Sequence, residues 1–99
     1  MDNFKTFDDL VFEPWGSRRK LAVPPSFLGA EQAVLEFPNG YGVSVLFGKA
    51  FYSNGIDTYE LAVLHNGRID YTTEVTDNVL AYITKEEVTA AMITLQKLP

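Results

Sequence analysis

The chain has 99 residues, of which 46% are hydrophobic and 13% aromatic, and this composition predicts one compact domain over residues 1–99. It contains no cysteine, so a disulfide framework, a thiolate zinc site and a cysteine nucleophile are excluded. The formal net charge is −5, which argues against general affinity for nucleic acids because that affinity depends on lysine and arginine.

The N-terminal residues 1–15 are rich in large apolar side chains. They predict a short helix or turn, capped by Thr6 with Asp8 and Asp9, that runs into an extended segment before Pro14. No basic stretch followed by an apolar run begins the sequence, and no apolar run approaches the ~20 residues of a membrane helix. We therefore expect a cytoplasmic protein without membrane contact.

The next stretch, residues 16–30, is interrupted by glycine and proline and predicts a long irregular connection. It holds the only cluster of positive charge, formed by Arg18, Arg19 and Lys20. Beside Trp15, this cluster could stack on or grip a nucleic acid. The acidic remainder of the protein favours the alternative that it is a solvated loop.

Residues 32–37 and 42–47 predict a β-hairpin around Pro38-Asn39-Gly40-Tyr41. A symmetric turn would place Val43 on the face of Glu36 and Val34. A bulge at Gly40 or Gly42 would instead bring Leu35 and Phe37 onto the face of Val43 and Val45.

Residues 48–57 form a connection with turn residues at Ser53-Asn54-Gly55 and with two aromatic side chains, Phe51 and Tyr52. Aromatic residues on a connecting loop are either packed against the core or available to a partner. Both alternatives stay open. The candidate binding surface consists of Phe51, Tyr52 and Asn54, together with Tyr41.

The stretch 58–75 predicts a second hairpin, because Asn66-Gly67 is favoured in the two-residue turn that joins two strands. This turn places His65 opposite Arg68 and Leu64 opposite Ile69, and farther along it places Ala62 opposite Tyr71 and Leu61 opposite Thr72. The run 61–64 is apolar on both faces, so we expect a central strand with a neighbour and a packed layer.

The C-terminus predicts a turn at 76–78, a short apolar extension at 79–82, and a helix. Thr84 and Glu87 form a capping box, and Ile83 and Val88 a hydrophobic staple. One apolar stripe should pack on the sheet; its members are Val88, Ala91, Met92, Leu95 and Leu98. Ile93 lies outside this stripe and is a candidate contact for a partner or a second copy, although single exposed apolar residues are common.

No arrangement of residues supports catalysis. His65 is the only histidine, and its place next to a tight turn is typical of a polar surface residue. Phosphate-loop, dinucleotide, zinc-protease and calcium-loop motifs are absent from the sequence. We therefore expect a protein that is not an enzyme and that uses no cofactor and no metal.

Four segments together resemble a family of small bacteriophage and prophage proteins of unknown function: FDDLVFEPW at 7–15, FPNGYGVSVLF at 37–47, YELAVLHNG at 59–67 and TDNVLAYITKEEVTAAM at 76–92. The sequence departs from the family pattern in residues 48–57 and at Asn78. The resemblance carries no catalytic or binding residue. It implies a setting, the cytoplasm of an infected bacterial host, and an accessory role.

The sequence thus predicts an α+β domain, with an antiparallel sheet of three to five strands and the terminal helix packed across one face. The leading functional hypothesis is a phage accessory protein that binds a host or phage protein and modulates or inhibits it. The alternative is a virion structural or assembly protein that forms a homo-oligomer through an exposed strand edge or Ile93.

Overall fold

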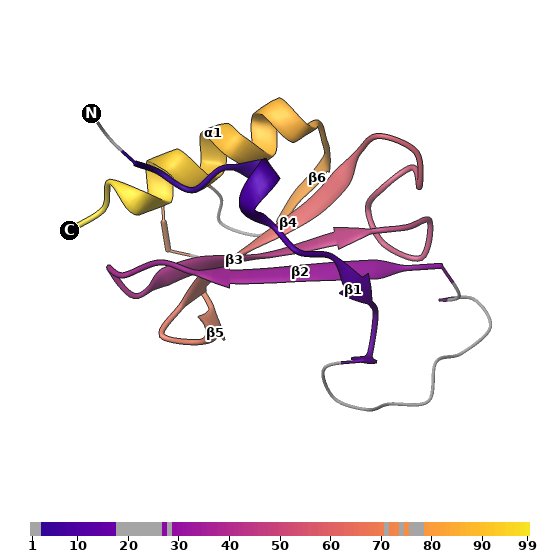
Figure 1. Cartoon of the computed structure of the whole chain (residues 1–99), viewed down its shortest axis with the longest axis horizontal. Helices are drawn as coiled ribbons and strands as arrows, with labels where there is room; N and C mark the ends of the chain where they lie inside the picture. Colours follow the sequence, from indigo (N-terminus) through magenta and orange to yellow (C-terminus); the bar gives the residue numbers. More distant parts are fainter. Residues whose placement is uncertain (1–2, 18–26, 28, 71, 74, 76–78) are drawn as a thin grey trace.

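The computed structural model describes residues 3–17, 27, 29–70, 72–73, 75 and 79–99. These form a six-stranded antiparallel sheet with one α-helix on it (Figure 1). Five strands are neighbours in chain order and the sixth pairs with β4; they are β1 (Glu13–Pro14), β2 (Glu31–Glu36), β3 (Tyr41–Phe47), β4 (Tyr59–His65), β5 (Arg68–Ile69) and β6 (Val79–Ile83). The predicted α+β class is confirmed. The sheet has six strands, one more than the upper limit of the expected three to five. Two of the six, β1 and β5, contain only two residues each.

The turn between β2 and β3 settles the register of the first hairpin. Leu35 lies opposite Val43, and Glu36 lies opposite Gly42. The Phe37 N–H donates to the Tyr41 carbonyl at 2.7 Å, and Gly40 adopts the left-handed conformation with φ 90°. The loop therefore has three residues with glycine at the bulge position. Of the two registers, the bulged one is confirmed.

The second hairpin begins as predicted and then ends early. His65 pairs with Arg68 and Leu64 with Ile69 across Asn66-Gly67. Beyond this point β6 takes the edge of β4, with Leu80 opposite Leu61 and Val79 opposite Ala62. The prediction that Leu61 faces Thr72 is wrong, and Tyr71 lies outside the described residues. The reason is a local turn, in which the Asp70 carboxylate accepts the Thr72 N–H at 2.7 Å.

The C-terminal helix α1 (Lys85–Gln96) begins at the predicted capping box, with the Glu87 N–H donating to the Thr84 hydroxyl. Its buried residues are four members of the predicted stripe: Val88, Ala91, Met92 and Leu95. They pack on one face of the sheet against a group that includes Val43, Val45, Leu61 and Val63. The fifth member of the stripe, Leu98, lies beyond the end of the helix and is half-buried against the core. The predicted turn at 76–78 lies outside the described residues. Among the described residues, no helix is long and apolar enough to cross a membrane.

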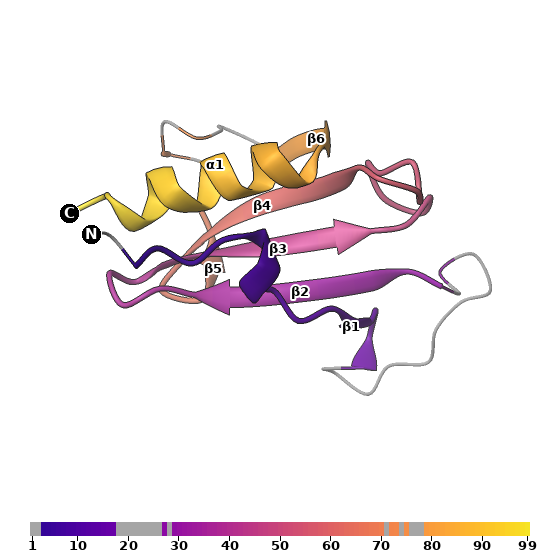
Figure 2. The same ribbon diagram turned by 45° about the horizontal axis from the view of Figure 1, so that its top comes forward.

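The N-terminal segment lies beside α1 on the same face of the sheet (Figure 2). It contains a single 3-10 turn, η1 (Phe7–Asp9). The Phe7 N–H donates to the Thr89 hydroxyl at 3.0 Å, and the Phe7 ring packs edge-on against Tyr59 at 5.0 Å. The N-terminal segment and α1 therefore form one layer over the core. The connection at 48–57 and the turns at the two ends of the sheet lie outside this layer.

Candidate functional site

The connection between β3 and β4 is held by the side chain of Asn54. Its Oδ1 accepts hydrogen bonds from three successive backbone N–H groups, those of Ile56, Asp57 and Thr58, at 2.8 to 3.0 Å. Its Nδ2 donates to the Asp57 carboxylate at 2.7 Å. Asn54, a predicted binding residue, is thus occupied in shaping residues 48–57.

Ser53 closes the same loop from inside. Its side chain is 4% exposed, and its hydroxyl donates to the Thr58 carbonyl at 2.6 Å. The same oxygen accepts from the N–H groups of Gly48 and Gly55, each at 3.1 Å. The hydrogen bonds of Asn54 and Ser53 together give residues 48–57 a defined loop structure. Sequence reasoning recognised the turn residues but did not single out Ser53, since one serine among turn residues carries no distinctive signal.

Phe51 points into a small aromatic cluster at the start of the sheet. Its ring stacks on Phe27 at 5.6 Å, and both rings lie close to Trp15, at 6.1 Å from Phe51 and 4.6 Å from Phe27. Phe51 is therefore one of the aromatic residues packed against the fold. The same contacts weaken the prediction that Trp15 stacks on a nucleic acid, because its ring already packs on two others. Arg18, Arg19 and Lys20 lie outside the described residues.

Tyr52 packs instead against Tyr82 of β6. The two side chains are 57% and 56% exposed, and their rings are 6.2 Å apart in an edge-to-face arrangement. The Tyr82 N–H donates to the Tyr52 carbonyl at 3.0 Å, and the Tyr52 N–H donates to the Glu60 carboxylate at 3.0 Å. These bonds fix the backbone on both sides of the pair. We call Tyr52 and Tyr82 the tyrosine pair.

The backbone at Tyr82 is unusual. The register between β4 and β6 shifts next to Glu60, so that β6 carries an extra residue there, and Tyr82 has φ 54°. A bulky residue is an outlier in this left-handed region. Bulges of this kind redirect a side chain at a sheet edge. Sequence reasoning missed Tyr82, because the run 79–82 looks like an ordinary apolar strand.

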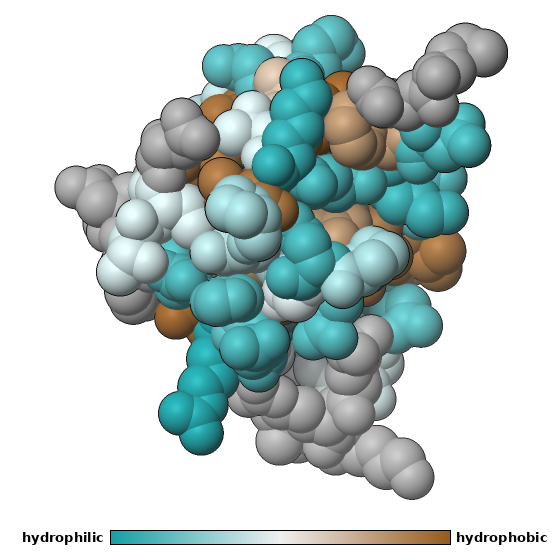
Figure 3. Space-filling view, turned by 90° about the vertical axis from the view of Figure 1, so that its left-hand side faces the viewer, coloured by the Kyte–Doolittle hydropathy of each residue, from teal (hydrophilic) through white to brown (hydrophobic). Residues whose placement is uncertain are grey.

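Tyr41 is the first residue of β3, whereas the loop that carries Tyr52 follows the last residue of this strand. Tyr41 therefore lies far from the tyrosine pair. Its ring stacks on the His65 imidazole at 4.1 Å with an interplanar angle of 6°. This end of the molecule is covered mainly by hydrophilic residues, with hydrophobic side chains in separate areas (Figure 3). Ile93 is half-buried on α1. The predicted binding residues Phe51, Tyr52, Asn54, Tyr41 and Ile93 therefore do not form one surface.

The His65 imidazole also lies 3.4 Å from the Asp70 carboxylate. Hydrogen bonds from the Thr72 side chain and backbone, with a smaller contribution from His65, hold the pKa of Asp70 below its ordinary value. The Thr72 hydroxyl donates to the carboxylate and not to the imidazole. This cluster ties down the turn after β5, and no described residue supplies a nucleophile to His65.

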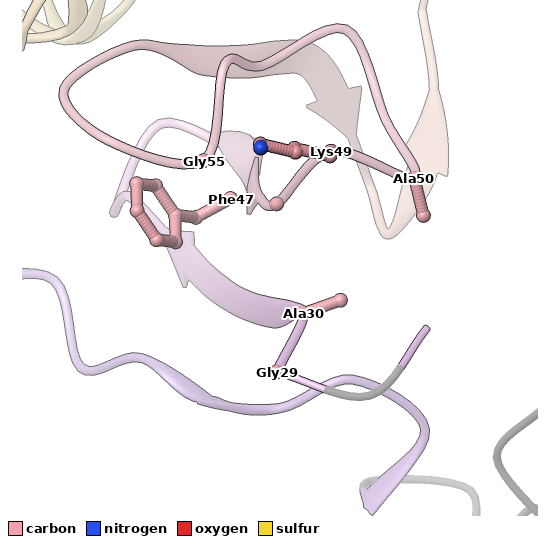
Figure 4. Close-up of a pocket in the computed structure, with 7 residues that line it drawn as sticks. Gly29, Ala30, Phe47, Lys49, Ala50 and Gly55 are labelled. Carbon is pink, nitrogen blue, oxygen red and sulfur yellow. The ribbon is translucent and has the colours of Figure 1, made fainter. Parts of the chain in front are cut away.

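A shallow cavity of about 220 Å³ lies between the start of β2 and the loop 48–57 (Figure 4). Its lining is mainly small and apolar, with one charged side chain, Lys49; the residues are Gly29, Ala30, Phe47, Gly48, Lys49, Ala50 and Gly55. Over the part of the protein that the structure describes, no three His, Asp or Glu side chains gather in a way that could hold a metal ion. The cavity thus presents neither an acid–base pair nor a ligand set.

Comparison of the sequence and fold with protein-family models, with curated proteins and with solved structures gave no match.

Proposed function

We propose that this protein is a non-enzymatic protein-binding module whose contact surface is centred on the tyrosine pair. The observation that carries the proposal is the strained backbone at Tyr82, which holds an exposed ring beside a second exposed ring. Strained residues cluster at functional sites. Tyrosine is also enriched at the centres of interfaces, since it offers a large contact area with few rotatable bonds.

Other residues of the loop 48–57 and of β4 define the chemistry that the partner must match. Ile56, which is 76% exposed, adds apolar area on the same loop. The carboxylates of Asp57 and Glu60 add negative charge, in a protein whose net charge is −5. Complementary potentials favour association and orient the partners. We infer a partner patch with an apolar centre and basic residues at its rim.

The resemblance to phage and prophage proteins supplies the setting of the proposal. In an infected bacterium, a small protein of this kind would act in the host cytoplasm on a host or phage protein, as a modulator or inhibitor. Two rings alone do not cover the ~800 Å² that a standard interface takes from each partner. The contact would therefore extend over the loop 48–57 and β6.

The experiment is affinity purification of the tagged protein from infected and uninfected host lysates, followed by mass spectrometry. The test variant is the double substitution Tyr52→Ala and Tyr82→Ala. Val11→Ala is the matched control, because Val11 is 75% exposed and lies in the N-terminal segment. We expect one protein in near-equal amount with the wild type and the control, and its loss with the double variant.

The result has to be reproduced with the purified partner, and circular dichroism has to show that the double variant is folded. Binding that weakens as salt is raised would support basic residues at the rim of the partner patch. Undiminished recovery with a folded double variant would show that the tyrosine pair is not the contact.

A second candidate function is assembly of identical copies, as in a virion structural protein, and the outer edge of β2 favours it. β1 pairs only with Glu31 and Gln32. The backbone N–H of Phe37 points toward β3, since it donates to the Tyr41 carbonyl. Backbone groups of successive residues in a strand point to alternate sides, so the N–H and C=O groups of Val34 and Glu36 point away from β3. No described strand covers them. An uncovered edge of this kind is a template for strand pairing.

Sedimentation equilibrium separates the two candidates. A stable monomer at micromolar concentration would count against assembly. A dimer that is lost on Val34→Lys would support it, since lysine on an edge strand opposes pairing. Ile93→Ala serves as the comparison, because it tests the helix surface instead of the strand edge.

A further inference from the structure

The sequence contains three Asn-Gly pairs, Asn39-Gly40, Asn54-Gly55 and Asn66-Gly67. Asn-Gly can modify itself without an enzyme. The glycine backbone nitrogen, on losing its proton, attacks the amide carbon of the asparagine; the new C–N bond closes a succinimide ring, the bond from that carbon to Nδ2 breaks, and ammonia leaves. Water then opens the ring at either carbonyl and leaves aspartate or isoaspartate. The reaction needs an asparagine amide that can turn toward the glycine and a glycine nitrogen that is accessible.

In two of the three pairs, hydrogen bonds to the asparagine amide and to the glycine N–H oppose this reaction. Asn39 donates from Nδ2 to the carbonyls of Leu95 and Leu98 at 2.8 and 3.0 Å, and its Oδ1 accepts the Tyr41 N–H at 3.1 Å. The nitrogen that would attack is occupied too, since the Gly40 N–H donates to the Phe37 carbonyl at 3.0 Å.

The second pair is bonded in the same way. Asn54 makes the four side-chain bonds that shape the loop 48–57, and the Gly55 N–H donates to the Ser53 hydroxyl. Each hydrogen bond contributes ~1 kcal/mol, and 1 to 2 kcal/mol lowers a population by about 5- to 30-fold. Both tied pairs should therefore react slowly in the folded protein.

The third pair has neither restraint. Asn66 and Gly67 are both exposed at the tip of the β4–β5 turn. The Asn66 backbone N–H bonds to the Gly40 carbonyl at 2.8 Å, but the Asn66 amide group and the Gly67 N–H have no hydrogen-bond partner among the described residues. We propose that Asn66 is a site of spontaneous, structure-selected deamidation, and that the product is a mixture of aspartate and isoaspartate.

The modification changes both charge and geometry at this turn. It adds one negative charge close to Glu36, whose Oε1 would lie 3.7 Å from a Cβ placed on Gly67. Isoaspartate also inserts a methylene into a two-residue turn. This conflicts with the pairing of His65 with Arg68, because loop length sets the register of a hairpin.

The test is to incubate the purified full-length protein in mildly alkaline buffer and to digest samples with a protease that cleaves after glutamate. Cleavage after Glu60 and Glu74 isolates the peptide of Asn66, and fragment ions separate Asn39 from Asn54 in the preceding peptide. We expect the Asn66 peptide to lose ammonia and gain water at least about fivefold faster than the other two sites. Anion-exchange chromatography should resolve the more acidic product.

Two controls make the result decisive. Asn66→Gly keeps a turn that tolerates positive φ and should abolish the early acidic product. Incubation in denaturant should bring the three sites to similar rates, because only folding distinguishes them in this proposal. Equal or faster reaction at Asn39 or Asn54 in the folded protein would overturn it, as would the same ranking of sites in denaturant.

Discussion

The backbone N–H of Tyr82 donates a 3.0 Å hydrogen bond to the carbonyl of Tyr52, and this bond joins the bulge of β6 to the loop 48–57. The loop itself is fixed by Asn54 and Ser53. The exposed rings are therefore mounted on a defined backbone. A residue in a strained conformation of this kind costs of order 1–3 kcal/mol, which the surrounding bonds must offset.

Replacing Tyr82 with glycine should relieve the backbone strain at this position. Glycine adopts positive φ without strain, so Tyr82→Gly should leave the free energy of unfolding unchanged or raise it by up to about 1 kcal/mol. Tyr82→Ala removes the ring but keeps the strain and should be the less stable of the two variants. Urea denaturation measures both. A glycine variant less stable than the alanine variant would show that the backbone at Tyr82 is not under strain.

Much of the fold could be predicted from local sequence signals. Asn66-Gly67, the capping box at Thr84 and the apolar stripe of α1 each carry a specific physical requirement that other segments do not share. The extent of β5 could not be predicted in this way. It depends on competition between residues 70–73 and the distant strand β6 for the same edge of β4, and pairing of distant strands leaves no local pattern.

The candidate site was predicted only in part. The aromatic loop 48–57 stood out by composition, and Tyr52 does lie on an exposed surface. Its neighbour Tyr82 could not be found, because the bulge that redirects it arises from the pairing of β6 with β4. Phe51 and Tyr52 are adjacent in sequence and point in different directions, which composition alone does not reveal.

Asn39 should be a major contributor to stability, because its amide group joins the end of α1 to the turn after β2. Its Nδ2 donates to the carbonyls of Leu95 and Leu98, and its Oδ1 accepts the Tyr41 N–H. Asn39→Ala leaves those carbonyls without this partner and should lower the free energy of unfolding by about 1–3 kcal/mol. Asn39→Asp should be at least as unstable, since an ionised carboxylate cannot donate and adds negative charge at the helix C-terminus. Chemical denaturation at neutral pH measures both, and a stable Asp variant would contradict the assigned bonds.

Asp70 should make stability depend on acid pH. Its pKa lies below the ordinary value of 3.8, chiefly because of the hydrogen bond from the Thr72 side chain. The unfolded protein therefore takes up the proton first as pH falls. The stabilising effect is present above the ordinary value and is lost as pH falls through the depressed pKa. Asp70→Asn should show a shallower loss of stability below about pH 4, and an unchanged acid profile would sink this assignment.

Tyr59 should have the opposite effect at alkaline pH. Burial raises the pKa of its hydroxyl above the ordinary 10.0, and the nearby charges of Glu31 and Asp57 raise it further. The unfolded protein then loses the proton first. The effect on stability is complete below the ordinary value and is lost as pH rises through the raised pKa.

Tyr59→Phe tests this directly, because the variant keeps the ring contacts with Phe7, Phe12 and Phe47 and removes only the hydroxyl. Above about pH 10 the wild type should lose stability more steeply than this variant, whereas Tyr52→Phe, at an exposed site, should follow the wild type. Absorbance of the ionised phenol supplies a second readout, since the wild type should contain a phenol with a pKa raised above 10.0 that is missing from Tyr59→Phe. Equal alkaline slopes in wild type and Tyr59→Phe would show that the buried hydroxyl does not control stability in this range.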